Sequence, residues 1–105
     1  MLTTMLRARK AGSPMPQAAV VISPWIDLSM QSTTWDTIDD PSASRESMQP
    51  YIDAYLGGQD TNRALADADI SPLYAELNDL PPLLVQVGDR EVFLGEAQEL
   101  SLIHI

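Results

Sequence analysis

Two short apolar runs that lie far apart in the chain limit most strongly what this sequence can fold into. The first run, AAVVIS, covers residues 18–23, and the second, LLVQV, covers residues 83–87. Neither run alternates strictly between apolar and polar residues, and each is too short to form a stable helix. Runs of this kind are typical of strands that are covered on both faces in a parallel sheet. We therefore predict two central strands of an α/β fold.

The segment before the first run is typical of the last turns of an amphipathic helix. Its apolar residues fall at helical spacing, its bases favour a helix C-terminus, and Gly12 follows as a stop signal. The residues of this pattern are Leu2, Met5, Leu6, Arg7, Arg9 and Lys10. A secretory signal carries its positive charges first, so this segment does not resemble one. Because no capping residue precedes the helix, we expect that the chain is part of something longer.

The excursion between the two strands, residues 28–80, is polar and long. Ser44 can cap a helix that Gly57 and Gly58 would end, and Pro50 should kink this helix or delay its start. A single helical turn is expected near Tyr74. An excursion of this length exceeds a simple connection and predicts a cap-like insertion.

The predicted order of helix, strand, partly helical excursion, strand and helix indicates a parallel sheet with helices packed against it. In such sheets, ligands and chemistry gather at the carboxyl ends of the strands. Ser23-Pro24-Trp25 follows the first strand, and Gly88-Asp89-Arg90-Glu91 follows the second. We therefore expect these two segments to lie along the same edge of the sheet.

Composition excludes several classes of function. A chain of 105 residues can build one core, and its net charge of −9 repels phosphate backbones and anionic lipid headgroups. We expect no nucleic-acid partner and no membrane span. The sequence has no cysteine, which excludes disulfides, a thiolate nucleophile and sulfur-ligated zinc. A reducing interior is compatible with this, and we expect a cytoplasmic protein that needs no cofactor.

Three phrases of the sequence together resemble a known family. They are RARKAGSPMPQAAVVISPWIDL, DAYLGG and ISPLYAELNDLPPLLVQVGDREVFL, in this order and at family-like spacing. They resemble the region downstream of the nucleophile in bacterial hormone-sensitive-lipase-like esterases, a fold-3 family of α/β-hydrolases. The resemblance covers about residues 1–100. It implies that residues 1–105 are a partial α/β-hydrolase domain from the C-terminal half, with part of a helical cap over 28–80, whereas 101–105 depart from the family.

The resemblance also implies a Ser-acid-His triad in a complete enzyme that hydrolyses small-molecule esters. No G-x-S-x-G phrase occurs in this chain, and Ser13 is predicted to be a loop residue. The family's histidine lies about thirty residues beyond its acid, whereas His104 follows Glu91 by only 13. We therefore expect His104 to be a frayed terminal residue. The chain would supply the triad acid but neither nucleophile nor base, and would be inactive alone.

Aligning VFLGEAQ with the family places Glu91 at the acid position, and Asp89 is the alternative. Both acids could instead simply favour the N-terminus of the helix that follows. Trp25 could line an acyl pocket, but packing is expected of an aromatic after a buried strand. Asp27 could touch a substrate, but an acid at this place more often caps local backbone N–H groups.

The acids Asp36, Asp39 and Asp40 lack the spacing and the glycine of a calcium loop, so we expect a solvated face and no metal. The alternative to an esterase segment is a small non-enzymatic α/β binding or regulatory domain, whose strand-end acids hold a divalent ion or receive a phosphoryl group. The number of strands separates the two hypotheses. A freestanding doubly wound domain needs about four or five strands, so two predicted strands favour the esterase segment.

Overall fold

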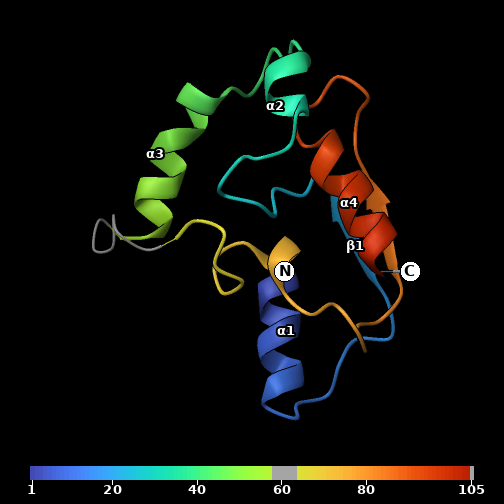
Figure 1. The fold of residues 1–105 in the computed structure, drawn as a ribbon. Helices are drawn as coiled ribbons and strands as arrows, with labels where there is room; N and C mark the ends of the chain where they lie inside the picture. The colour runs from blue at the N-terminus through green and yellow to red at the C-terminus, as the bar shows by residue number, and fades with distance from the viewer. Residues whose placement is uncertain (58–63, 105) are drawn as a thin grey trace.

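The computed structural model describes residues 1–57 and 64–104, except for the side chain of His104. Its elements in chain order are α1 (Leu2–Lys10), β1 (Ala19–Ile22), α2 (Thr34–Thr37), α3 (Arg45–Tyr55), the 3₁₀ turn η1 (Pro72–Tyr74), β2 (Leu83–Gln86) and α4 (Leu94–His104) (Figure 1). This order confirms the predicted alternation of helices and strands. No helix within the described ranges is both long and apolar enough to span a membrane.

The two strands pair in parallel, as predicted. The register runs from Ala19 opposite Leu83 to Ile22 opposite Gln86. Backbone bonds continue the ladder at both ends: the N–H of Ala19 donates to the Pro82 carbonyl at 2.9 Å, and that of Ser23 donates to the Gln86 carbonyl at 2.7 Å. Proline lacks only the N–H donor, so Pro82 can precede the strand and still contribute its carbonyl oxygen.

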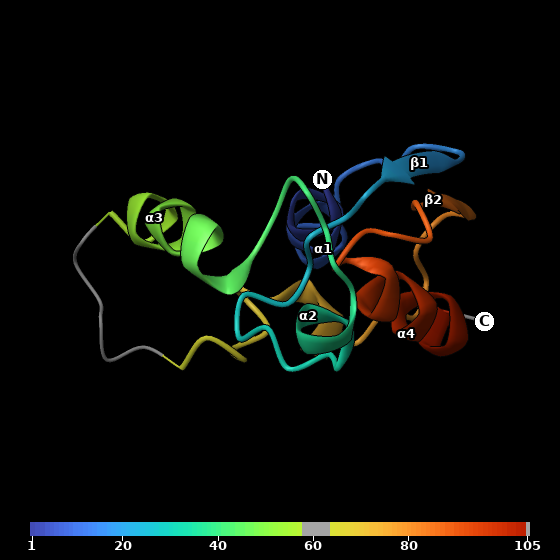
Figure 2. The ribbon, with the colours of Figure 1, turned by 90° about the horizontal axis from the view of Figure 1, so that it is seen from above.

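Only one face of this sheet is covered in the described part of the chain. Val21 lies on the inner face, in a core cluster with residues of α1, α4 and the turn η1. Helix α4 lies along one side of the two strands (Figure 2). The side chains that define the outer face, Val20, Ile22 and Leu84, are 52%, 70% and 56% exposed. The described part of the chain therefore covers only one of the two faces that the apolar runs predict to be buried, because no described element packs on the outer face.

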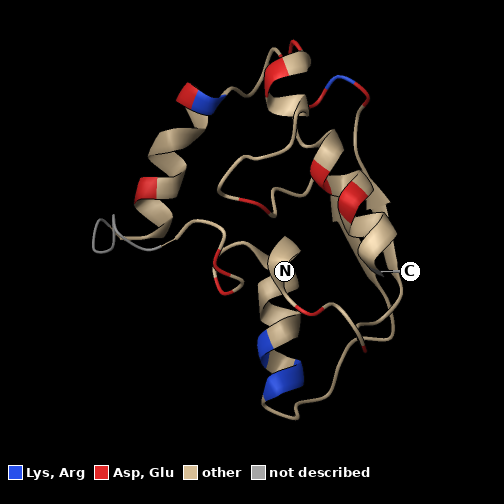
Figure 3. Ribbon diagram, viewed as in Figure 1, with Lys and Arg blue, Asp and Glu red and all other residues tan. Residues whose placement is uncertain are grey.

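Two hydrophobic clusters hold the helices and loops together. The first joins α1, β1 and α4 through Leu2, Met5, Val21, Ile26, Leu73, Leu77 and Leu100. The second joins the loop after β1 to α2, α3 and the turn before α4 through Leu28, Met30, Trp35, Ala43, Ile52, Ile70 and Val92. The bases of α1 gather at its last turn (Figure 3). Gly12 follows with φ of 70°, the left-handed conformation expected of a stop signal.

Helix α3 begins as the capping residue predicts. The Ser44 hydroxyl accepts the Ser47 N–H at 3.1 Å, and the Ser47 hydroxyl accepts the Ser44 N–H at 2.8 Å, which completes a capping box. Pro50 lies inside the helix but does not delay its start, because this box already satisfies the first donors. Gly57 follows the helix with φ of 65°, whereas Gly58 lies outside the described residues.

The other described residues of the excursion are mostly irregular. The single turn expected near Tyr74 is confirmed as η1, whereas the four-residue helix α2 was not predicted. The assignment of 28–80 to a cap and of 101–105 to a non-family tail stays a prediction.

Candidate active site at the carboxyl edge of the sheet

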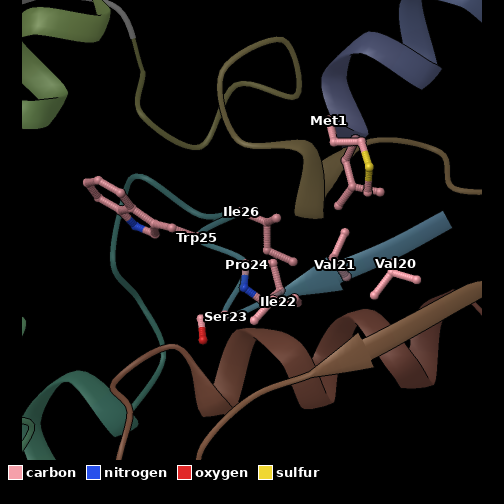
Figure 4. Close-up of a pocket in the computed structure, with 9 residues that line it drawn as sticks. Met1, Val20, Val21, Ile22, Ser23, Pro24, Trp25 and Ile26 are labelled. Atoms are coloured by element: carbon pink, nitrogen blue, oxygen red, sulfur yellow. The ribbon is translucent and has the colours of Figure 1, made fainter.

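Glu91 and Ser23 meet at the carboxyl edge of the sheet. Ser23 follows β1 (Figure 4), and Glu91 lies in the turn after β2. The Ser23 hydroxyl lies 2.8 Å from each carboxylate oxygen of Glu91, so its single hydrogen can bond either of them. The expectation that the two strand ends share one edge is therefore confirmed at atomic distance.

Gly88 provides the second contact to the Glu91 carboxylate. Its N–H donates to Oε2 of Glu91 at 2.6 Å. A Cβ atom at position 88 would lie 3.3 to 3.4 Å from the Glu91 side chain, so glycine allows this close approach. A carboxylate offers about four acceptor positions. Glu91 therefore keeps capacity for a further donor, such as an imidazole N–H.

Ser23 holds this position with an uncommon backbone conformation. Its φ is 47°, in the left-handed region that residues other than glycine rarely adopt. Such residues cost of order 1–3 kcal/mol and cluster at functional sites. The sequence predicted that Ser23 lies at this edge. It did not predict the hydrogen bond to Glu91, because that bond depends on the backbone angle of Ser23.

Asp89, the alternative acid, has different surroundings. It is exposed, and within the described ranges it accepts no hydrogen bond and forms no ion pair with Arg90. The neighbouring hollow has a volume of about 460 Å³ and is lined by the ends of both strands, Gly88 and Glu91, but not by Asp89. The geometry thus distinguishes the two acids, although it does not test which of them acts in catalysis.

Glu96, in the first turn of α4, is a fully buried acid that the sequence analysis missed. Its Oε2 accepts the N–H groups of Ile26 at 2.8 Å and Asp27 at 3.1 Å, and its Oε1 accepts the indole N–H of Trp35 at 2.9 Å. Burial raises the pKa of Glu96 to about 7, and the Asp27 charge adds to this, against the three N–H donors. The spacing of the buried residues Val92, Glu96 and Leu100 is the signal that could have revealed it.

An aromatic cluster lies beside this buried acid. The ring centroid of Trp35 lies 5.5 Å from that of Phe93, edge to face, and 6.1 Å from that of Trp25. These ring contacts are the packing expected of Trp25, and its alternative role in an acyl pocket stays a prediction. Trp25 also lines a groove of about 370 Å³ along β1, with Met1, Leu2 and residues 20–26 (Figure 4).

Asp27 caps the loop after β1, as expected. Its Oδ1 accepts the N–H of Ser29 at 2.9 Å, and its Oδ2 accepts the N–H of Gln31 at 3.2 Å and the Tyr74 hydroxyl at 2.9 Å. All of these contacts are structural. The loop that carries Ser23 is thus fixed to the excursion around η1.

Two of the three acids of the 36–40 segment, Asp36 and Asp40, also have structural partners. Asp36 pairs with Arg45 at 3.0 Å, and this bonding holds the Asp36 pKa below its usual value. Asp40 accepts the N–H groups of Ser42 at 2.8 Å and Val92 at 3.0 Å, and the Ser42 bonds lower its pKa. Within residues 1–57 and 64–104, no group of three acids or histidines could hold a metal ion.

Neither candidate for the other triad members lies at this edge. Ser13 lies in the loop after α1, as predicted. His104 is the last residue of α4, and the structure describes only its backbone. Its fraying therefore stays a prediction.

Comparison with known proteins defines the class of this chain. Residues 1–101 match the family described as alpha/beta hydrolase fold. The chain therefore belongs to the α/β-hydrolase fold family.

Among its relatives is an acetyl-hydrolase of Streptomyces hygroscopicus, 38% identical over 99 residues that cover 89% of this chain and 30% of the relative. An esterase of Acinetobacter venetianus is 32% identical, over 92% of this chain and 32% of the relative. An esterase of the bacterial hormone-sensitive lipase family superposes with a TM-score of 0.86 at 37% identity, over 98% of this chain and 34% of that one. The chain thus spans about a third of the length of the relatives it matches.

Proposed function

We propose that this segment belongs to a carboxylic ester hydrolase with a Ser-acid-His triad, and that Glu91 is the triad acid. The observation that carries the proposal is the contact of the Glu91 carboxylate with the Ser23 hydroxyl and the Gly88 N–H at the carboxyl edge of the sheet. The names of the relatives, acetyl-hydrolase and esterase, support an ester substrate. The cytoplasmic location stays a prediction.

The role proposed for Glu91 follows from its fixed position and its spare acceptor capacity. A carboxylate there accepts the N–H of an imidazole, holds it in the tautomer that accepts a proton from serine, and stabilises the imidazolium that forms. Glutamate can fill this role as aspartate does. The bonds from Ser23 and Gly88 restrain rotation of the carboxylate and leave acceptor positions for an imidazole N–H.

The 105-residue chain alone should show no ester hydrolysis above buffer, because an acid without nucleophile and base catalyses no acyl transfer. A short-chain chromogenic ester provides the assay. Turnover that an active-serine reagent abolishes would contradict the proposal.

The acid assignment needs a complete enzyme. In the chimera that we would use, residues 1–101 replace the matching segment of the Streptomyces acetyl-hydrolase. Glu91→Gln should lower kcat by about three orders of magnitude or more, because the amide no longer orients and stabilises the imidazole. Asp89→Asn should stay within a few-fold of the parent, since Asp89 forms no hydrogen bond or ion pair in the described structure. The reverse result would move the assignment to Asp89.

A further inference from the structure

We propose that Glu96 is a positioning residue, which holds the Glu91 carboxylate in place by fixing α4 against the loop after β1. This inference rests on the proposed function of Glu91. It assigns to a buried acid outside the triad a role in the geometry of the reaction.

Glu96 connects three segments that are distant in sequence. It lies on α4, and its carboxylate bonds Ile26 and Asp27 in the loop after β1 and Trp35 in α2. Helix α2 lies beside the start of α4 in both ribbon views (Figures 1 and 2). The side chain is 0% exposed, so water cannot replace these bonds.

The same segments meet a second time at Glu91. Ser23 belongs to the loop that contains Ile26 and bonds the Glu91 carboxylate. The Glu91 carbonyl accepts the Leu94 N–H at 3.0 Å, which joins Glu91 to the first residue of α4. A shift of α4 relative to the loop therefore changes the distance between Ser23 and Glu91. The bonds of Glu96 oppose this shift.

Close contacts between the start of α4 and residues 32–35 further restrict movement of the helix relative to the loop after β1. The Thr34 hydroxyl donates to the Val92 carbonyl at 2.6 Å and accepts the Gly95 N–H at 3.2 Å. A Cβ atom at Gly95 would clash with the Ser32 hydroxyl oxygen, so any larger residue here would force Ser32 to move. The start of α4 is thus seated directly on the 32–35 segment.

The charge of Glu96 has a geometric purpose. Removing a carboxylate from water is unfavourable, and burial raises its pKa. Above this pKa of about 7 the group is an ionised carboxylate, and only this form accepts at both oxygens without a donor of its own, as three N–H donors from two directions require. A glutamine could accept from Ile26 and Asp27, but its NH₂ group would then face the indole N–H of Trp35.

That conflict provides the test, in the same chimera. Glu96→Gln should lower kcat by about 10- to 100-fold with KM within about threefold, because small misplacements of a catalytic group have effects of this size. Trp35→Phe removes one donor and should lower kcat by about threefold to tenfold. The double variant Glu96→Gln/Trp35→Phe removes the clash between two donors and should recover part of the activity lost in Glu96→Gln.

Two controls separate positioning from general stability. Glu99→Gln changes an exposed acid on the same helix and should leave kcat within about twofold. Active-site titration with a serine-directed reagent counts the competent molecules, so a merely unstable variant keeps its kcat per titrated site.

The outcomes distinguish the two proposals. If Glu91→Gln abolishes activity while Glu96→Gln and Trp35→Phe keep kcat within about twofold, the positioning role is wrong and the triad assignment stands. If Glu91→Gln is fully active, both proposals fail. Should Glu96→Gln not fold, Trp35→Phe decides alone, and an unchanged kcat in that variant overturns the positioning role.

Discussion

The carboxyl edge of the sheet and its outer face have opposite characters. At the edge, the polar groups of Ser23, Glu91 and Glu96 all have protein partners, and Glu96 is fully buried. On the outer face, the apolar side chains of Ile22 and Leu84 are exposed to solvent. The polar arrangement of the proposed site is therefore specified within this segment, whereas burial of the sheet requires contacts that the described residues do not provide.

The largest expected effect concerns the outer face. The isolated chain should associate or remain loosely packed, because exposed apolar strands with unpaired edges are typical aggregation sites. Val20→Thr/Ile22→Thr keeps β-branched side chains and should shift the chain toward monomer on a size-exclusion column. A sharp cooperative thermal transition from a monomer of the unchanged chain would contradict this expectation.

The second largest effect is a pH dependence of stability that is caused by the buried acid Glu96. The folded pKa of Glu96, about 7, lies above the usual 4.5, so the folded state keeps this proton to higher pH. Stability should therefore fall as pH rises from about 4.5 to 7, by roughly 3 kcal/mol, and then level off. Asp27 is the charged neighbour, and its repulsion acts in the same direction.

Urea unfolding of the chimera and its Glu96→Gln variant across this pH range measures the effect. The unfolding free energy of the variant should not show this decrease with pH, since its amide does not titrate. Asp36 and Asp40, whose pKa values are lowered from 3.8, contribute stability that is lost only at lower pH. Parallel profiles for parent and variant would show that Glu96 does not titrate as stated.

The smallest effect is expected at the surface pair of Asp36 and Arg45. Asp36→Asn should shift the urea midpoint slightly at low salt and leave it unchanged in 1 M salt, because exposed ion pairs are weak and screened. A large shift that persists in high salt would mean that the pair contributes to the fold as strongly as a buried contact does.

Local patterns predicted most of the regular elements. The apolar runs predicted β1 and β2, the bases and Gly12 predicted the end of α1, and Ser44 predicted the start of α3. Each of these signals lies within the element or within two residues of its end. The resemblance of three phrases to an esterase family likewise depends on residues close together in sequence, and the family match confirms the class.

The missed features depend on contacts between distant segments. Helix α2 has only four residues and no periodicity, and it is held by the bonds of Thr34 to Val92 and of Trp35 to Glu96. Glu96 looks like an ordinary helical acid until its donors 61 to 70 residues away are known. The exposure of the outer face could not be predicted either. Apolar residues indicate that a strand is buried, but they do not show whether the covering residues belong to this chain.

The parallel pairing of β1 with β2 has a consequence for synthesis on the ribosome. The partners Ser23 and Glu91 are separated by 68 residues, and chains grow at about 5 to 20 residues per second. Once β1 has been made, roughly 3 to 14 seconds pass before the ribosome adds Glu91. During this interval β1 has no pairing strand from its own later sequence. The nascent chain is then most open to capture by a chaperone or by another apolar segment, so translation speed across the excursion should influence the yield of folded protein.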